Sequence, residues 1–315
     1  MTAISFSSPA LSPTPQTIAG QLITSIGTDQ SQIATLQEQI STGMVINQPS
    51  DNPALAADVM TMNSSLTRAQ QYVSNAADGQ GWLQQGTSTL NQVMSALQSI
   101  TSAVESVSGQ ALSGQTAAVN GIAAQVASGL QQILGLANTT YNNQAIFAGT
   151  GSTTQAFDST GAYLGNTTAP SRTVAPGTQV TIAQIGSTVF GTGTAGLLTG
   201  AGATSGSVGV LQQIVNDLRS GNLSAATGVD LQHLQAATAT VANAAATLGA
   251  NYQNMQAFSA QATATQQALQ TELGNLQDTN LPKAATQLTE AQSSYQAALW
   301  ATAQVSQQSL VQFLG

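Results

Sequence analysis

The sequence predicts a mainly α-helical protein: an elongated, multi-helix rod built from both chain termini, with a small β-rich domain inserted in the middle. Two observations predict this fold. Apolar residues recur every seven positions near both ends of the 315-residue chain, which is the pattern of a coiled coil. Between them lies a Gly-, Thr- and Ser-rich stretch with short β-branched runs, which is typical of strands and turns. Aromatic residues make up only 4% of the chain, so thin helical interfaces are expected in place of a core of large side chains.

The expected organisation has six parts. A mobile N-terminal segment is predicted over 1–17, where Pro9, Pro13 and Pro15 disfavour regular structure. The other parts are an N-terminal coiled-coil helix over 18–43, a helical rod domain over 44–141, a β-rich inserted domain over 142–209, the returning half of the rod over 210–277, and a C-terminal coiled-coil helix over 278–315.

In the N-terminal coiled-coil helix, one row holds Ala19, Ile26, Ile33 and Ile40, and a second row holds Leu22 and Leu36. Gly43 is a suitable residue to end this helix. In the following loop, Ser50 or Asp51 is expected to cap the next helix, and Pro53 suits its first turn. That helix is predicted to end near Asp78 at the Gly-marked sequence DGQG.

Two further helices are predicted in the rod domain. Apolar residues from Trp82 to Val107 follow helical spacing, and Gly109 and Gly114 are expected to end that helix. A third helix is predicted over 118–140. The inserted part begins with the turn–strand–turn sequence NNQAIFAGTG and contains QVTIAQI, which alternates as a half-buried strand does.

Helical spacing returns at Val210, resumes after the sequence GN at 221–222, and continues from about Leu231 through Leu273. The polar sequence QDTN is expected to interrupt it before the C-terminal helix. There Leu281, Leu288 and Tyr295 form one row, next to a row of Ala284, Ala291, Ala298 and Val305. Such long helices cannot bury their apolar rows alone. The residues expected at the assembly interface are Leu22, Ile26, Ile33, Leu36, Ile40, Leu281, Leu288, Tyr295, Leu299, Val305 and Leu310.

Charge excludes several classes of partner. The net charge is −8, with four Lys and Arg residues in all, whereas nucleic acids and anionic lipids are bound by clustered basic residues. No membrane insertion is expected, because no run of about 18 apolar residues exists. The first residues, MTAISFSSPALSPTPQ, lack a basic n-region, so a cleaved secretory signal peptide is not expected.

No catalytic, cofactor-binding or metal-binding residue is predicted, and an enzyme is not expected. The chain has no cysteine, and it contains no nucleophile-elbow, Walker or HExxH motif. GTGTAG at 191–196 matches the dinucleotide-binding pattern weakly, because no helix opening follows it. The lone histidine, His233, is interpreted as a residue of a solvated helix face.

Two stretches resemble the signatures of the bacterial flagellin superfamily. QEQISTGMVINQPSDNPALAADVMTMNSSL at 37–66 is similar to its N-terminal signature, although Met44 and Val45 stand where the family has a basic residue. DTNLPKAATQLTEAQSSYQAALWATAQVSQQSLVQFLG at 278–315 is similar to its C-terminal signature. Within the superfamily, Pro49–Pro53 and the sequence NQAIFAG at 143–149 resemble the hook–filament junction proteins more than the filament flagellins.

The resemblance implies a structural protein of the bacterial flagellum, which joins hook to filament by helical self-assembly through its terminal helices. It implies secretion through the flagellar export apparatus, with an extracellular location in the flagellum. The implied partners are copies of the same chain, flagellin, the adjacent hook-associated protein, and an export chaperone on the C-terminal helix. Two alternatives remain open: a filament flagellin proper, and a secreted adhesin whose β insert binds a ligand.

Overall fold

The computed structural model describes residues 15–109, 115–151, 154–191, 196–198 and 208–314, without side chains at some helix ends. The chain divides into two compact units, which are described separately below. Unit 1 contains residues 1–66 and 268–315, and unit 2 contains residues 67–267. Helices α2 (Pro53–Gly109) and α7 (Val229–Gln277) each contribute residues to both units.

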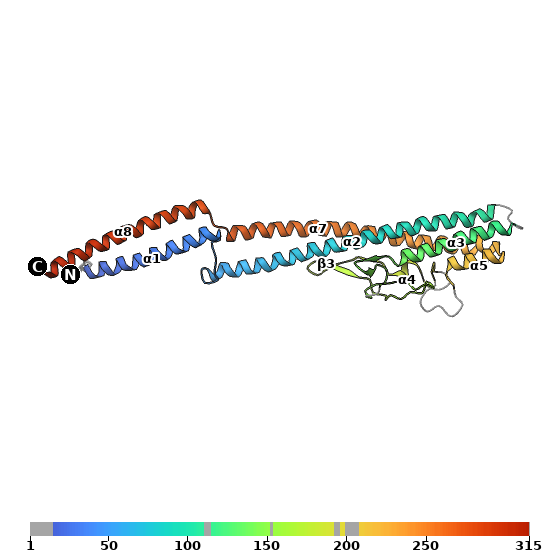
Figure 1. Ribbon diagram of the computed structural model, residues 1–315, viewed down its shortest axis with the longest axis horizontal. Helices are drawn as coiled ribbons and strands as arrows, with labels where there is room; N and C mark the ends of the chain where they lie inside the picture. The colour runs from blue at the N-terminus through green and yellow to red at the C-terminus, as the bar shows by residue number, and fades with distance from the viewer. Residues whose placement is uncertain (1–14, 110–114, 152–153, 192–195, 199–207, 315) are drawn as a thin grey trace, which may run out of the picture. The chain divides into compact units, whose positions relative to one another are not determined.

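In unit 1 the N-terminal helix α1 (Pro15–Thr42) lies beside the C-terminal helix α8 (Leu281–Leu314), as Figure 1 shows. The two helices are antiparallel. They meet at a clasp of main-chain atoms, which we define as residues 43–45 and 277–279. In the clasp, the Val45 N–H donates to the Gln277 carbonyl over 2.7 Å, and the Thr279 N–H donates to the Gly43 carbonyl over 2.8 Å. Met44 and Asp278 form an antiparallel β-bridge between these bonds.

The loop before α2 is ordered by side chains that bond to the main chain. Pro53 begins α2 as expected, but the cap is Asn52, whose Oδ1 accepts the Leu55 N–H over 3.1 Å. Asp51 was an expected cap; its Oδ2 accepts the N–H groups of Asn47 and Gln48 and so closes the loop. The prediction of Ser50 or Asp51 as the cap is therefore wrong by one or two positions, since a cap bonds the N–H two or three residues ahead.

Unit 2 has one continuous apolar core. Parts of α2 and α7 surround it together with α3 (Thr116–Ala137), α5 (Val210–Ser220) and α6 (Leu223–Thr227). Leu83, Leu97, Ile133, Leu211 and Leu248 are among its fully buried members. Since the core also includes residues of the inserted part, such as Phe147 and Phe190, that part packs directly on the helices.

The predicted helix break at residues 78–81 is wrong, because α2 continues to Gly109. The glycines there serve close packing. A Cβ added at Gly79 would collide with the side chain of Met255, and one at Gly81 would collide with the hydroxyl group of Tyr141. Absence of a side chain lets other elements approach the helix, and the helix tolerates the glycines because this packing offsets their low helix propensity. Gly109 ends α2 as predicted; Gly114 lies outside the described residues.

The inserted part contains less strand than the sequence predicts. Its strands are β1 (Thr140–Tyr141), β2 (Gln144–Ala145), β3 (Ser171–Ala175) and β4 (Thr178–Thr181), paired antiparallel as β1–β2 and β3–β4. The turn predicted at NNQAIFAGTG is present, with positive φ at Asn142 and Asn143. QVTIAQI is extended only to Thr181, and a short helix, α4 (Gly186–Val189), follows it. The mainly α fold with a small β region in the middle is confirmed.

Polar contacts attach the β3–β4 hairpin to the helices of unit 2. Arg172 of β3 donates from Nε to Asp78 of α2 over 2.8 Å, and its guanidinium lies 5.9 Å from the ring centre of Trp82. From the other side, Asn251 of α7 donates to the Thr181 carbonyl over 2.9 Å. Asn75 of α2 donates to the Thr173 carbonyl. These contacts fix the hairpin to both long helices.

A pair of buried carboxyl groups lies where α5, α6 and α7 meet. Both oxygens of Asp217 accept amide hydrogens, from Gln213 over 2.9 Å and from Asn222 over 3.1 Å. The hydrogen bond from Gln213 is the largest influence that lowers the pKa of Asp217. Burial, followed by the bond and the charge of Asp217, raises the pKa of Asp230 to about 6, and the charge of His233 opposes this rise. The pair therefore holds one proton, on Asp230, in mildly acidic solution.

Unit 2 is expected to become more stable as the pH falls from 7 to 5. Because folding raises the pKa of Asp230 above its ordinary 3.8, the stability from the neutral form is fully present below 3.8 and is lost as the pH rises through about 6. Asp217, with a lowered pKa, acts in the opposite direction only below about pH 4. The free energy of unfolding should rise by about 1 kcal/mol between pH 7 and pH 5. Urea unfolding at both pH values measures it, and Asp230→Asn should remove the rise; an unchanged rise in that variant contradicts the assignment.

Candidate assembly interface

The α1–α8 pair of unit 1 buries one narrow apolar seam. Leu36 is 6% exposed, and Ala284 and Ala291 are 3% and 6% exposed. Ile33, Ile40 and Leu288 pack against these three residues and are partly buried. Alanine side chains are small, so two helices can approach closely where they meet, and Leu36 is almost completely covered against Ala284 and Ala291.

The predicted interface residues have different surroundings in the pair. The structure brings Ile33, Leu36, Ile40 and Leu288 together in the seam. Leu22, Ile26 and Tyr295 are partly buried, whereas Leu281 and Leu299 are 49% and 43% exposed. Val305 and Leu310 belong to α8, but their side chains lie outside the described residues.

The list of predicted interface residues leaves out two features of the seam. Ala284 and Ala291 form its most buried part on α8, although the prediction named only larger side chains as interface residues. Asp29 accepts a hydrogen bond from the Ser294 hydroxyl over 3.1 Å, which joins α1 to α8 through side chains. The signal for Asp29 was present in the sequence, since it interrupts the row of Leu22 and Leu36 at the seven-residue spacing.

Large apolar side chains of unit 1 remain at the surface of the single chain. Trp300 is 78% exposed, Met60 66% and Ile23 64%. With Met44, Val45, Leu281 and Leu299, they give unit 1 seven of the nine large exposed apolar residues that occur among the described part of the chain. Exposed aromatic and aliphatic groups on a unit whose helix pair buries so little mark surface for further packing.

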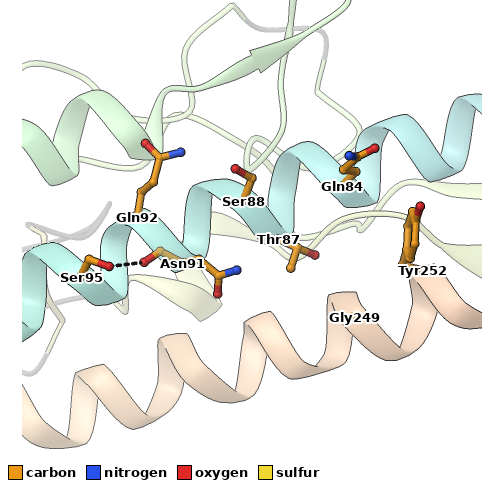
Figure 2. Close-up of a pocket in the computed structure, with 8 residues that line it drawn as sticks. All are labelled: Gln84, Thr87, Ser88, Asn91, Gln92, Ser95, Gly249 and Tyr252. Atoms are coloured by element: carbon orange, nitrogen blue, oxygen red, sulfur yellow. Dashed lines mark hydrogen bonds between the residues drawn. The ribbon is translucent and has the colours of Figure 1, made fainter.

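Unit 2 carries a surface groove of about 520 Å³ between α2 and α7. Figure 2 shows Gln84, Ser88 and Gln92 on α2, pointing away from α7 in this view, and Tyr252 on α7 at one end. The remaining lining residues are Thr87, Asn91, Ser95 and Gly249. Among these described residues Tyr252 alone has a titratable side chain, so the groove has no acid–base pair with which to perform catalysis.

Within the described residues, no group of three or more His, Cys, Asp or Glu side chains could hold a metal ion. No helix in that part of the chain has the length and apolar character needed to cross a membrane. His233 is exposed, as interpreted from the sequence, and residues 192–195 of the GTGTAG sequence lie outside the described residues.

The seam and the long helices define a protein of the coiled-coil, helical-scaffold class. Comparison with protein families then identifies it further. Residues 15–152 match the bacterial flagellin N-terminal helical region, and residues 231–314 match the bacterial flagellin C-terminal helical region. The chain therefore belongs to the bacterial flagellin superfamily, whose members are structural components of the flagellum. No curated protein sequence matches it.

Solved structures share the fold. A protein assigned as a flagellar hook-associated protein from Vibrio parahaemolyticus is 21% identical, with a TM-score of 0.61 over 72% of this chain and 100% of that one. FlgL from Bacillus cereus is 18% identical, with a TM-score of 0.55 over 68% of this chain and 99% of that one. The flagellar junction protein FlgL from Legionella pneumophila is 15% identical, with a TM-score of 0.50 over 68% of this chain and 100% of that one.

Proposed function

We propose that this chain is a junction subunit of the bacterial flagellum, which joins the hook to the filament by helical self-assembly. The observation that carries the proposal is the α1–α8 pair, which closes a seam of a few residues and leaves large apolar side chains exposed. The choice of a junction subunit over a filament subunit is supported by the sequences at 49–53 and 143–149, and by the fold likeness to proteins named FlgL.

The proposed mechanism starts from the thinness of the seam. Ordering two long helices costs conformational entropy, and burial of Leu36 with two alanines offsets little of that cost. Neighbouring copies would cover Leu281, Leu299 and Trp300 and so supply the missing burial. In this proposal the segments 18–43 and 278–315 form an inner tube, the segments 44–141 and 210–277 form the next layer, and 142–209 faces outward.

The proposed partners follow from this role. Copies of the chain contact one another within the junction, flagellin contacts it on one side, and the adjacent hook-associated protein contacts it on the other. The chain reaches the extracellular flagellum through the flagellar export apparatus. Because α8 exposes Leu281, Leu299 and Trp300, it would bind other apolar surfaces inside the cell. We therefore propose that an export chaperone covers it before export.

Immuno-electron microscopy of isolated hook–filament preparations tests the proposal. Antibodies against this chain should label one narrow band where hook and filament meet. Labelling along the whole filament would contradict the junction role and would favour the filament flagellin alternative. For the adhesin alternative, a chain lacking residues 150–205 provides the test: a junction subunit should still label the band, whereas an adhesin should lose its ligand.

A further inference from the structure

Asp29 interrupts the apolar seam of α1. Counting by sevens, it occupies the position between Leu22 and Leu36, where the pattern calls for a third leucine. Its side chain is partly buried, and it faces α8, where its Oδ2 accepts the hydrogen bond from the Ser294 hydroxyl over 3.1 Å. A charged residue in such a row lowers the stability of a coiled coil but can specify which helices pair.

The other apolar residues of α1 fit a competing partner. One row of α1 holds Ile26, Ile33 and Ile40, and the other holds leucines. A β-branched row next to a leucine row is the arrangement that favours parallel, two-stranded coiled coils. α8 differs, because its seam is built on Ala284 and Ala291. The apolar pattern of α1 therefore suits a second copy of α1 at least as well as it suits α8.

The surroundings of the Asp29 carboxylate differ between an α1–α1 pair and the α1–α8 pair. In a parallel, in-register pair of α1 helices, each residue faces the same residue of the other copy. Two Asp29 carboxylates would then meet in an apolar seam, where burial and like charge both disfavour the pair. Against the antiparallel α8, the same carboxylate faces the Ser294 hydroxyl and is hydrogen-bonded.

We propose that Asp29 is a specificity residue, which prevents α1 from pairing with α1 of a second copy and so keeps it available for α8. The repulsive element that excludes the wrong partner is the carboxylate itself; the bond to Ser294 makes the carboxylate tolerable in the correct pair. This inference rests on the proposed function in taking α1 and α8 as the assembling helices. Its test uses purified protein and needs no flagellum.

The experiment uses the absence of cysteine from the chain. Ile26→Cys places one thiol in the isoleucine row, where a parallel α1–α1 pair brings the two copies of residue 26 together and an antiparallel pair does not. Adding Asp29→Leu should turn a monomer into a dimer at micromolar concentration, with at least a tenfold larger fraction of disulfide-linked protein after mild oxidation. Sedimentation velocity and non-reducing electrophoresis measure the two effects.

Three variants in the same Ile26→Cys background control the test. Glu38→Leu makes the same change of charge at an exposed position of α1 and should stay monomeric. Ser294→Ala removes the hydrogen bond but keeps the carboxylate, and should also stay monomeric. Asp29→Ala removes the charge without adding apolar surface and should dimerise more weakly than Asp29→Leu, which covers the case that the leucine variant fails to fold.

Each outcome of this experiment either supports or overturns the proposed role of Asp29. Dimers in the Asp29 variants alone support the inference. Monomeric Asp29→Leu and Asp29→Ala proteins would overturn it, as would equal dimer formation by the chain that retains Asp29. Dimer formation by Glu38→Leu would assign the effect to general loss of charge, and dimer formation by Ser294→Ala would assign it to the lost bond; either result overturns the role of the carboxylate. If the chain fails to label the junction but the Asp29 variants dimerise, only the proposed function fails.

Discussion

Deletion of residues 281–315 is expected to abolish incorporation of the chain into flagella and to leave unit 2 folded. The deletion removes α8, and with it half of the seam around Leu36. The core of unit 2 contains no residue of α8 and so remains complete. Quantitative immunoblots of purified flagella measure incorporation, and the protein released into the medium should be measured in parallel, which separates failed export from failed assembly.

A pair of point variants provides a finer version of this test. Ala291→Glu places a charge in the seam, where residue 291 is 6% exposed, and should reduce incorporation strongly. Gln292→Glu places the same charge at an exposed position next to it and should have no effect. Normal incorporation of the deleted chain, or equal effects of the two glutamates, would show that the seam does not carry assembly.

Phe157→Ala is expected to destabilise unit 2 by about 3–5 kcal/mol, the usual cost of removing a buried phenylalanine. The Phe157 ring is 1% exposed and lies 5.4 Å from the ring of Phe190 and 5.2 Å from that of Tyr163, measured between centroids. Asn138 also bonds its main chain on both sides: the Asn138 Oδ1 accepts the Phe157 N–H, and its Nδ2 donates to the Phe157 carbonyl. The backbone is therefore held in place, so the cavity left by the ring cannot collapse easily.

The two tryptophans allow this loss to be measured in unit 2 alone. In a Trp300→Phe background, Trp82 is the remaining tryptophan, and it is buried in the core of unit 2. Its fluorescence during urea unfolding should show the lower midpoint of Phe157→Ala. Leu164→Ala, at a position 51% exposed, is the control and should unfold almost as the parent does. A change below 1 kcal/mol for Phe157→Ala would show that the inserted part does not stabilise the helices.

The long helices and the seam could be predicted because their signal is local and periodic. Ile33, Leu36, Ile40 and Leu288 lie at the seven-residue spacing, and the structure places all four in one cluster. The partners of these residues beyond the single chain remain a prediction. The turn at Asn142 and Asn143 was also predictable, since asparagine adopts positive φ more readily than most residues do.

Features that depend on contacts distant in sequence could not be predicted. Gly79 and Gly81 indicated a break until the structure placed Met255 and Tyr141 against them. Asp217 and Asp230 are separated by a turn and a short helix, and no local pattern indicates that their carboxyl groups meet. The strand content was overestimated because β-branched residues such as Thr188 and Val189 can also lie in a short helix, as they do in α4.

The clasp has a consequence for how the sequence can vary. Its two hydrogen bonds join main-chain groups of Gly43, Val45, Gln277 and Thr279, and Gly43 has a φ of +74°. Side chains at residues 44 and 45 take no part in these bonds, so Met44 and Val45 can replace the basic residue typical of the superfamily while α1 and α8 remain tethered at this end. The side chains at residues 44 and 45 can therefore vary among related sequences without loss of the clasp. Replacement of Gly43 should weaken the clasp most, because its positive φ disfavours any residue with a side chain.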